Sequence, residues 1–243
     1  MLSLIIPAHN EEAVLPATLD ALRGAARTVG EPFEIIVVDD SSTDATAAIG
    51  RAAGAHVVRL EKRQIAAARN AGAHASHGEW LVFVDADTLV PPATLAAAVA
   101  ALRGASVGGG ARVRLERHAP RWARALWSVV ILRLYAGAGL AAGCFLFVRR
   151  DAFDSAGGFD ERYFASEEVH LSRALARQGR FVVLRETVIT SARKFRMFPA
   201  WRFLMWALRL QGGALKRRHT LWYGGQREGP GPGGAGSPGR SSR

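Results

Sequence analysis

Short β-branched runs alternate with helical patterns along the first hundred residues, and this alternation constrains the fold more than any other feature. Strands are expected at 4–6, 34–38, 55–60 and 80–84, and helices at 13–22, 43–53, 66–75 and 92–102. Strands that alternate with helices form a parallel sheet covered on both faces. We therefore expect an α/β domain with a mostly parallel central sheet flanked by helices.

The alternation loosens after residue 105. Further strands are expected near 108–115, 144–148 and 181–184, and helices over 122–134 and 167–178. The last residues, 224–243, are rich in Gly, Pro and Ser and hold no apolar anchor, so a disordered tail is expected there.

The cysteine content and the N-terminus bear on the compartment. Cys144 is the only cysteine of the 243 residues, which excludes an internal disulfide and a multi-cysteine zinc site. The first residues lack a basic n-region and a cleavage site, and they are expected to form a strand. The apolar stretch 125–148 is interrupted by Arg133 and three glycines, so a transmembrane span is not expected. These features favour a cytoplasmic location.

The net charge of +11 is concentrated at the C-terminal end. From residue 193 onward there are eleven Lys/Arg and one acidic residue, which leaves 21 basic and 20 acidic residues before it. A basic amphipathic helix is expected over 199–223, with Arg202, Arg209 and Lys216 aligned at helical pitch. Such a helix can lie on an anionic membrane as a peripheral contact, or it can pack on the domain with its basic side chains exposed. Nucleic acid is not an expected partner, because no recognised nucleic-acid-binding fold is present.

Polar residues follow three of the expected strands. Ligands of open parallel sheets gather where strands end, because the loops there present polar groups to one crevice. The three segments are Pro7-Ala8-His9-Asn10-Glu11-Glu12, Asp39-Asp40-Ser41-Ser42-Thr43-Asp44 and Asp85-Ala86-Asp87.

Asp85 and Asp87 are the candidate metal ligands. Two carboxylates one residue apart on an extended turn can share a hard cation, and Mg²⁺ or Mn²⁺ prefers oxygen ligands together with substrate phosphates. The alternative is that Asp87 only caps the turn before Pro91 and Pro92. The position directly after an apolar strand favours the metal site.

Asp39 and Asp40 also allow two interpretations. One carboxylate can accept a base N–H while its neighbour meets a ribose hydroxyl, or the pair can form an Asx turn and cap the following helix, with Ser41, Ser42 and Thr43 as N-cap candidates. His9, a lone histidine in a turn, is more often structural than catalytic.

Six segments, taken in order and spacing, resemble glycosyltransferase family 2 over about residues 1–195. They are the segment from Pro7 to Glu12, the segment from Val37 to Thr46, Arg69-Asn70-Ala71-Gly72, the segment from Gly78 to Asp87, the segment from Gly143 to Phe153, and Gly157-Gly158-Phe159-Asp160-Glu161.

The resemblance implies a GT-A fold, a nucleoside-diphosphate sugar donor of UDP or GDP type, a divalent metal (Mg²⁺ or Mn²⁺) and inversion at the anomeric carbon. It implies one domain over 1–198, with a donor half at 1–104 and an acceptor and base half at 105–198. Its implied donor residues are Pro7 and Glu11 at the nucleotide pocket, Asp39 and Asp40 at the base and ribose, Arg69 near the nucleotide, and Asp85 and Asp87 at the metal.

The resemblance also points to a catalytic base. The family's usual Asp falls on Glu168, and Glu167 is the substitute candidate. The extra methylene of Glu lengthens the reach by about one bond, and placement to about an ångström matters in catalysis. The alternative is that both carboxylates simply favour the first turn of a helix that begins after Ser166.

These features predict a metal-dependent, inverting transferase that adds one sugar to a lipid-linked or saccharide acceptor at the cytoplasmic face of the membrane. The Gln-x-x-Arg-Trp signature of processive synthases is absent. A non-catalytic sugar-nucleotide-binding or scaffold protein is the alternative. A nucleotidyltransferase is disfavoured because the turn 9–12 is acidic rather than glycine-rich and basic. Arg193 and Lys194 can meet the donor diphosphate or form a solvated surface.

Overall fold

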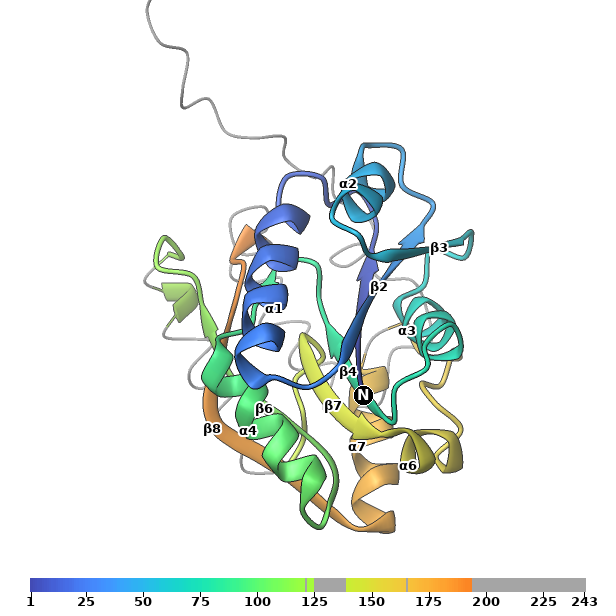
Figure 1. Cartoon of the computed structure of the whole chain (residues 1–243), viewed down its shortest axis with the longest axis vertical. Helices are drawn as coiled ribbons and strands as arrows, with labels where there is room; N and C mark the ends of the chain where they lie inside the picture. The colour runs from blue at the N-terminus through green and yellow to red at the C-terminus, as the bar shows by residue number, and fades with distance from the viewer. Residues whose placement is uncertain (121, 125–138, 165, 194–243) are drawn as a thin grey trace, which may run out of the picture.

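The computed structural model describes residues 1–120, 122–124, 139–164 and 166–193, and within them eight strands form one sheet. The strand order is β3-β2-β1-β4-β7-β6-β8-β5 (Figure 1). The strands are β1 Leu2–Ala8, β2 Phe33–Asp40, β3 His56–Leu60, β4 Trp80–Val84, β5 Thr88–Leu89, β6 Ser106–Leu115, β7 Phe145–Arg149 and β8 Arg180–Thr190.

The first four long strands pair as the sequence predicted. β1 is parallel to both β2 and β4, and β2 is parallel to β3. The second half is mixed, because β7 runs antiparallel to β4 and β6, whereas β6 and β8 are parallel. The C-terminal ends of the parallel strands β1, β2 and β4 therefore lie side by side. We call this end of the strands the carboxyl edge of the sheet, and the end where these strands begin the opposite edge.

Helices cover both faces of the sheet (Figure 1). Strand β1 shows why: Leu4 and Ile6 point into the core under one set of helices, and Ile5 points into the other, all fully buried. Burying each such side chain contributes about 1.5–3 kcal/mol. One face carries α1 Leu15–Val29, α2 Thr46–Ala52 and α4 Pro92–Arg103, and the other carries α3 Ile65–His74, α6 Arg150–Ser155 and α7 Glu167–Gln178.

The start of α2 differs from the sequence expectation. The helix begins at Thr46, and the carboxylate of Asp44 accepts the Thr46 N–H at 2.9 Å, so the predicted N-caps at 41–43 are wrong. The loop before α2 is instead held by side chains of the loop that follows β1. The Thr43 N–H donates to Asn10 Oδ1 at 2.8 Å, and the Ala45 N–H donates to Glu12 Oε2 at 3.0 Å.

Other boundaries differ less or lie outside the described residues. Strand β8 continues to Thr190 beyond the expected end at Leu184, and β5 and α6 were not predicted. None of the helices within the described ranges combines the length and the apolarity needed to cross a bilayer. Most of the expected helix 122–134, Lys194, the basic helix 199–223 and the tail 224–243 fall outside the described residues.

Helix α3 packs unusually close to β1 at Gly72. A Cβ on Gly72 would lie 2.3 Å from Ile5 Cγ2 and 3.0 Å from Val38 Cγ2, so only glycine allows this approach. The close packing sets α3, which carries Arg69, directly against β1 and β2.

Candidate functional site

The loops after β1 and β2 are joined by hydrogen bonds at the sheet edge. The Asn10 N–H donates to Ser42 Oγ at 2.9 Å, and the Glu11 N–H donates to Thr46 Oγ1 at 2.8 Å. His9 Nδ1–H donates to the Asp40 carbonyl oxygen at 2.8 Å. His9 therefore helps to hold the two loops together, in agreement with the structural role favoured from the sequence.

Asp39 and Asp40 have different surroundings. The carboxylate of Asp40 accepts three consecutive backbone N–H groups, from Lys62 at 2.8 Å, Arg63 at 2.7 Å and Gln64 at 2.8 Å, and so fixes the loop that leads into α3. The carboxylate of Asp39 instead accepts the Ser42 N–H, at 3.2 Å. Asp40 thus serves the start of α3, and Asp39 stays the prediction for nucleotide contact. Pro7 is buried in β1 beyond the last β1–β4 pair, Ile5 with Phe83.

Arg69 connects the end of β4 to the start of α7. It is 1% exposed, and its guanidinium donates to Glu167 Oε1 at 2.5 Å and to Asp85 Oδ1 at 2.9 Å. It also donates to the Gly143 carbonyl oxygen at 2.6 Å. Burial alone lowers the pKa of a guanidinium, but the neighbouring carboxylates, Asp85 and Glu167 foremost, raise the pKa of Arg69 above its ordinary value. The group is a permanent cation inside an acidic cluster.

The first turn of α7 places both predicted base candidates at this cluster. Glu167 and Glu168 are only 4% and 9% exposed, so they are not solvated first-turn charges alone. Glu167 is paired with Arg69, and the charge of Glu168 also contributes to the raised pKa of Arg69. A Cβ on Gly143 would lie 3.4 Å from both Arg69 Nη2 and Glu168 Cδ, so the chain before β7 packs directly on both side chains.

Asp85 and Asp87 follow β4 and face different cations. Asp85 is paired with Arg69, and Asp87 Oδ2 lies 2.9 Å from Arg193 Nη2. The N-cap of α4 is Pro91 and has no side-chain cap bond, so Asp87 does not cap that helix. The side chains of Asp85 and Asp87 are 27% and 17% exposed and can still reach a ligand from solvent.

The residues present fit a hard divalent cation that completes its shell from a substrate. Asp85 and Asp87 supply carboxylate oxygens of the type that Mg²⁺ and Mn²⁺ prefer. Over the described part of the chain, no group of three or more His, Cys, Asp or Glu side chains is arranged to hold a metal ion. The remaining ligands would therefore have to come from water and from the phosphates of a bound donor.

Arg193 is the site residue that sequence reasoning assigned least clearly. It lies three residues after β8 and also approaches Glu11, with Nη1 2.8 Å from Glu11 Oε2. The contact between Arg193 and Asp87 joins residues 106 positions apart, so no local pattern could have indicated it.

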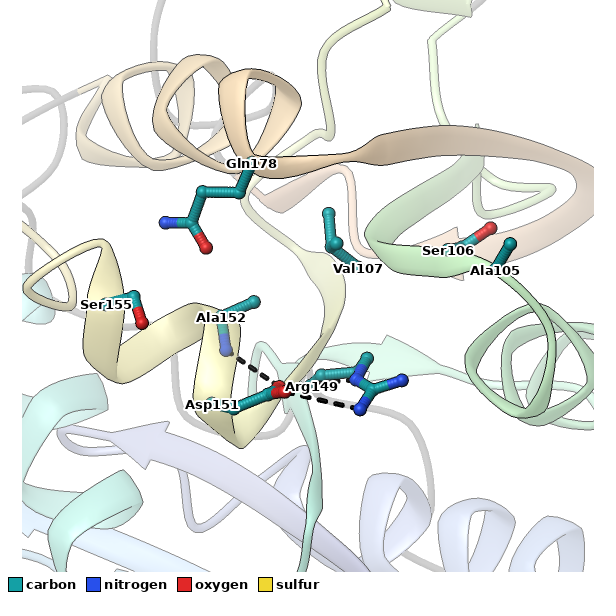
Figure 2. Close-up of a pocket in the computed structure, with 8 residues that line it drawn as sticks. All are labelled: Ala105, Ser106, Val107, Arg149, Asp151, Ala152, Ser155 and Gln178. Atoms are coloured by element: carbon teal, nitrogen blue, oxygen red, sulfur yellow. Dashed lines mark hydrogen bonds and ion pairs between the residues drawn. The ribbon is translucent and has the colours of Figure 1, made fainter.

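A hollow of about 240 Å³ lies at the opposite edge of the sheet (Figure 2). Arg149, whose side chain pairs with Asp151 there, is the register partner of Trp80 at the beginning of β4, whereas Asp85 follows the end of β4. None of the predicted site residues lines this hollow, and it is separate from the acidic cluster. It is lined by Ala105, Ser106, Val107, Arg149, Asp151, Ala152, Ser155 and Gln178.

Solved structures with a similar fold include several glycosyltransferases. The mannosyltransferase PcManGT from Pyrobaculum calidifontis, in complex with GDP-Man and Mn²⁺, superposes with a TM-score of 0.66 at 21% identity, over 92% of this chain and 67% of that one. Glucosyl-3-phosphoglycerate synthase from Mycobacterium tuberculosis superposes with a TM-score of 0.60 at 23% identity, over 87% of this chain and 79% of that one. At these identities the likeness establishes the GT-A fold.

Sequence comparison gives the family. An undecaprenyl-phosphate 4-deoxy-4-formamido-L-arabinose transferase from Pseudomonas paraeruginosa is 34% identical over 162 residues, which are 60% of this chain and 46% of that protein. The chain thus spans about half the length of the curated relatives it matches. The profile of Glycosyl transferase family 2 matches residues 3–157. With the family's sequence pattern, the GT-A fold and the acidic cluster at the sheet edge in agreement, the chain belongs to glycosyl transferase family 2.

Proposed function

We propose that this chain transfers one sugar from a nucleoside-diphosphate sugar to an acceptor with inversion at the anomeric carbon, using a divalent cation. The observation that carries the proposal is the pair of contacts made by Arg69. One guanidinium binds Asp85 of the donor side at 2.9 Å and Glu167 of the base side at 2.5 Å. Residues from 1–104, the proposed donor half, and from 105–198, the proposed acceptor half, thus contribute to one cluster.

The charge of the cluster supports a cation requirement. Five carboxylates lie together with two guanidiniums, and a donor diphosphate would add further negative charge. A bound Mg²⁺ or Mn²⁺ would neutralise the diphosphate as it leaves. Asp85 and Asp87 would hold the cation, while Pro7, Glu11 and Asp39 would line the nucleotide pocket. The carboxylates are those of Glu11, Asp85, Asp87, Glu167 and Glu168, and the guanidiniums are those of Arg69 and Arg193.

Glu168 is the proposed general base. In an inverting displacement the acceptor oxygen bonds to the anomeric carbon while the bond from that carbon to the diphosphate breaks. A hydroxyl acceptor must lose its proton in this step. Glu167 is paired with Arg69 at 2.5 Å, and Glu168 is its buried neighbour in the first turn of α7. We assign the base to Glu168 because the family resemblance implies the base at this position.

The acceptor is proposed to be lipid-linked, with a saccharide as the broader alternative. The relative from Pseudomonas paraeruginosa is named for an undecaprenyl-phosphate acceptor. Such an acceptor would place this chain at the cytoplasmic face of a membrane. GDP- and UDP-type donors are both retained, because the solved structures with this fold include complexes with GDP-Man and with UDP.

Nucleotide binding tests the donor site directly. UDP or GDP should bind the wild-type chain at least about tenfold more tightly with Mn²⁺ than with EDTA, because the cation offsets the repulsion between diphosphate and carboxylates. Asp87→Asn should remove most of this difference, as measured by calorimetry. The matched control is Asp151→Asn, on the surface at the opposite edge, which should keep it. Equal affinity with and without metal in the wild type would contradict the metal assignment.

An exposed face of the last three strands in the sheet order, β6, β8 and β5, supports the proposal of a peripheral membrane contact. Arg114, Ile189 and Leu89 are register neighbours across β6, β8 and β5, so their side chains share one face. Leu89 and Ile189 are each 37% exposed. This apolar and basic face lies beside the acidic cluster, because the Ser191 N–H that follows β8 donates to the Asp87 carbonyl oxygen.

Vesicle binding tests this contact. The full chain should co-sediment with phosphatidylglycerol vesicles and not with phosphatidylcholine vesicles, and high salt should release it. Arg114→Glu should weaken binding roughly thirtyfold, because it removes one positive charge and adds a negative one, and each such charge near an anionic surface is worth about 1 kcal/mol. Arg51→Glu, an exposed change on α2, is the control. Equal binding to both vesicle types would contradict the membrane proposal.

A further inference from the structure

Arg193 lies between two carboxylates that come from different strand ends. Its Nη1 is 2.8 Å from Glu11 Oε2, and its Nη2 is 2.9 Å from Asp87 Oδ2. The side chains of Arg193, Glu11 and Asp87 are only 17%, 9% and 17% exposed. Solvent therefore screens these charges weakly, and the guanidinium is a direct counter-charge for both carboxylates.

The backbone fixes the segment that carries Arg193. The Ser191 N–H donates to the Asp87 carbonyl oxygen at 3.1 Å, and the Arg193 N–H donates to Ser191 Oγ at 3.2 Å. The end of β8 is thereby fastened to the turn after β4. These bonds hold the backbone of Arg193 beside Asp87, so that its side chain starts within reach of the Asp87 carboxylate.

The same carboxylate is a proposed cation ligand, and this creates a conflict. A divalent cation on Asp87 would lie within a few ångströms of the Arg193 guanidinium, and like charges at that distance repel strongly where water is scarce. Arg193 and the cation therefore compete for Asp87. A donor diphosphate offers the guanidinium another partner, because guanidinium binds phosphate oxygens in a bidentate geometry.

We propose that Arg193 is a positioning residue that acts as the counter-ion of Glu11 and Asp87 before substrates bind and transfers to the donor diphosphate when the donor binds, which leaves Asp87 to the cation. This inference rests on the proposed function. Its consequence is that cation and nucleotide bind cooperatively: the nucleotide gives Arg193 a new partner, and the cation then gains Asp87. Without nucleotide, Arg193 opposes the cation.

The test compares two bindings in the full-length Arg193→Gln variant. Mn²⁺ alone, followed by electron paramagnetic resonance, should bind the variant roughly tenfold more tightly than the wild type, because a like charge has been removed. UDP or GDP at saturating Mn²⁺, followed by calorimetry, should bind roughly tenfold more weakly, because a phosphate partner has been lost. These opposite shifts distinguish a counter-ion from a residue that only supports the fold, whose loss would weaken both.

Two further variants sharpen the result. Arg185→Gln removes the same charge from an exposed position on β8 and should change neither binding. Arg193→Lys keeps the charge without the planar fork, so it should leave Mn²⁺ binding near the wild-type value and still weaken nucleotide binding. Mn²⁺ affinity that is unchanged or lower in Arg193→Gln would overturn the proposal. If neither nucleotide binds the wild type, the proposed function fails, while the Mn²⁺ comparison still decides the role of Arg193.

Discussion

Glu168→Gln should reduce sugar transfer to a hydroxyl acceptor by about 10²–10⁴-fold, the usual contribution of a positioned general base. Gln has the same shape as Glu and cannot take the proton. Donor binding should stay within about twofold of the wild-type value, because Asp85 and Asp87 are untouched. Turnover is measured by product mass, and nucleotide affinity by calorimetry. An active Glu168→Gln variant would move the base elsewhere.

The matched variants separate the base from its neighbour. Glu168→Asp should retain much of the activity, since Asp is the residue that the family resemblance implies at this position. Glu167→Gln should act mainly through Arg69, with a lower melting temperature as well as lower turnover. Loss of transfer in Glu167→Gln with an unchanged melting temperature would instead favour Glu167 as the base.

The Glu168→Gln variant can also show whether the attacking oxygen of the acceptor belongs to a hydroxyl or to a phosphate. The second ionisation of a phosphate monoester lies near pH 6, so a lipid monophosphate already carries an unprotonated oxygen at neutral pH. Glu168→Gln should then cost little with a phosphate acceptor and much with a hydroxyl acceptor. A large loss with both kinds of acceptor would mean that Glu168 also positions the acceptor or the sugar.

Arg69→Met should destabilise the fold by about 3–5 kcal/mol, because it leaves Asp85 and the buried Glu167 without their shared cation. Domains of this size are stable by only about 5–15 kcal/mol, so the melting temperature should fall by roughly 10 °C. The measurement is thermal unfolding followed by circular dichroism.

Two controls accompany this prediction. Arg149→Met breaks the exposed pair with Asp151 and should cost less than about 1 kcal/mol. Arg69→Lys keeps the charge but cannot reach three partners in the geometry of a guanidinium, so it should fall between the wild type and Arg69→Met. A melting temperature for Arg69→Met equal to that of Arg149→Met would show that the buried contacts of Arg69 contribute nothing to stability.

The sequence predicted the strands and helices whose signals are local. Trp80–Val84 and Glu167–Gln178 were predicted with both ends correct, because an apolar run and a helical period are visible within a short window. Strand β5 has two residues and exists only through its pairing with β8 about a hundred positions later. The second half of β8 was missed because Arg185 and Glu186 interrupt its apolar pattern, at a register shift against β6.

The candidate site shows the same difference between what local sequence signals indicate and what only long-range contacts determine. Residue types and spacing were enough to select Asp39, Asp85 and Asp87, and the family resemblance selected the Glu pair. They could not show that Asp40 binds the loop before α3, or that Arg69 reaches Glu167 across 98 positions. Those contacts depend on how α3 and α7 pack on the same face of the sheet, which is a tertiary property.

A single buried guanidinium sets the spacing between Asp85 and Glu167. The width of that group, rather than the length of any loop, determines how far Asp85, a proposed cation ligand, stands from the first turn of α7. The loop at 41–46 is joined mainly to the loop at 8–12, and the loop at 8–12 reaches the cluster through Glu11 and Arg193 rather than through Arg69. Variation in the loop at 41–46 can therefore change the proposed nucleotide preference while the spacing between Asp85 and the first turn of α7 stays the same. Under the proposed function, donor preference could then diversify in this architecture without a change in the line of attack on the sugar.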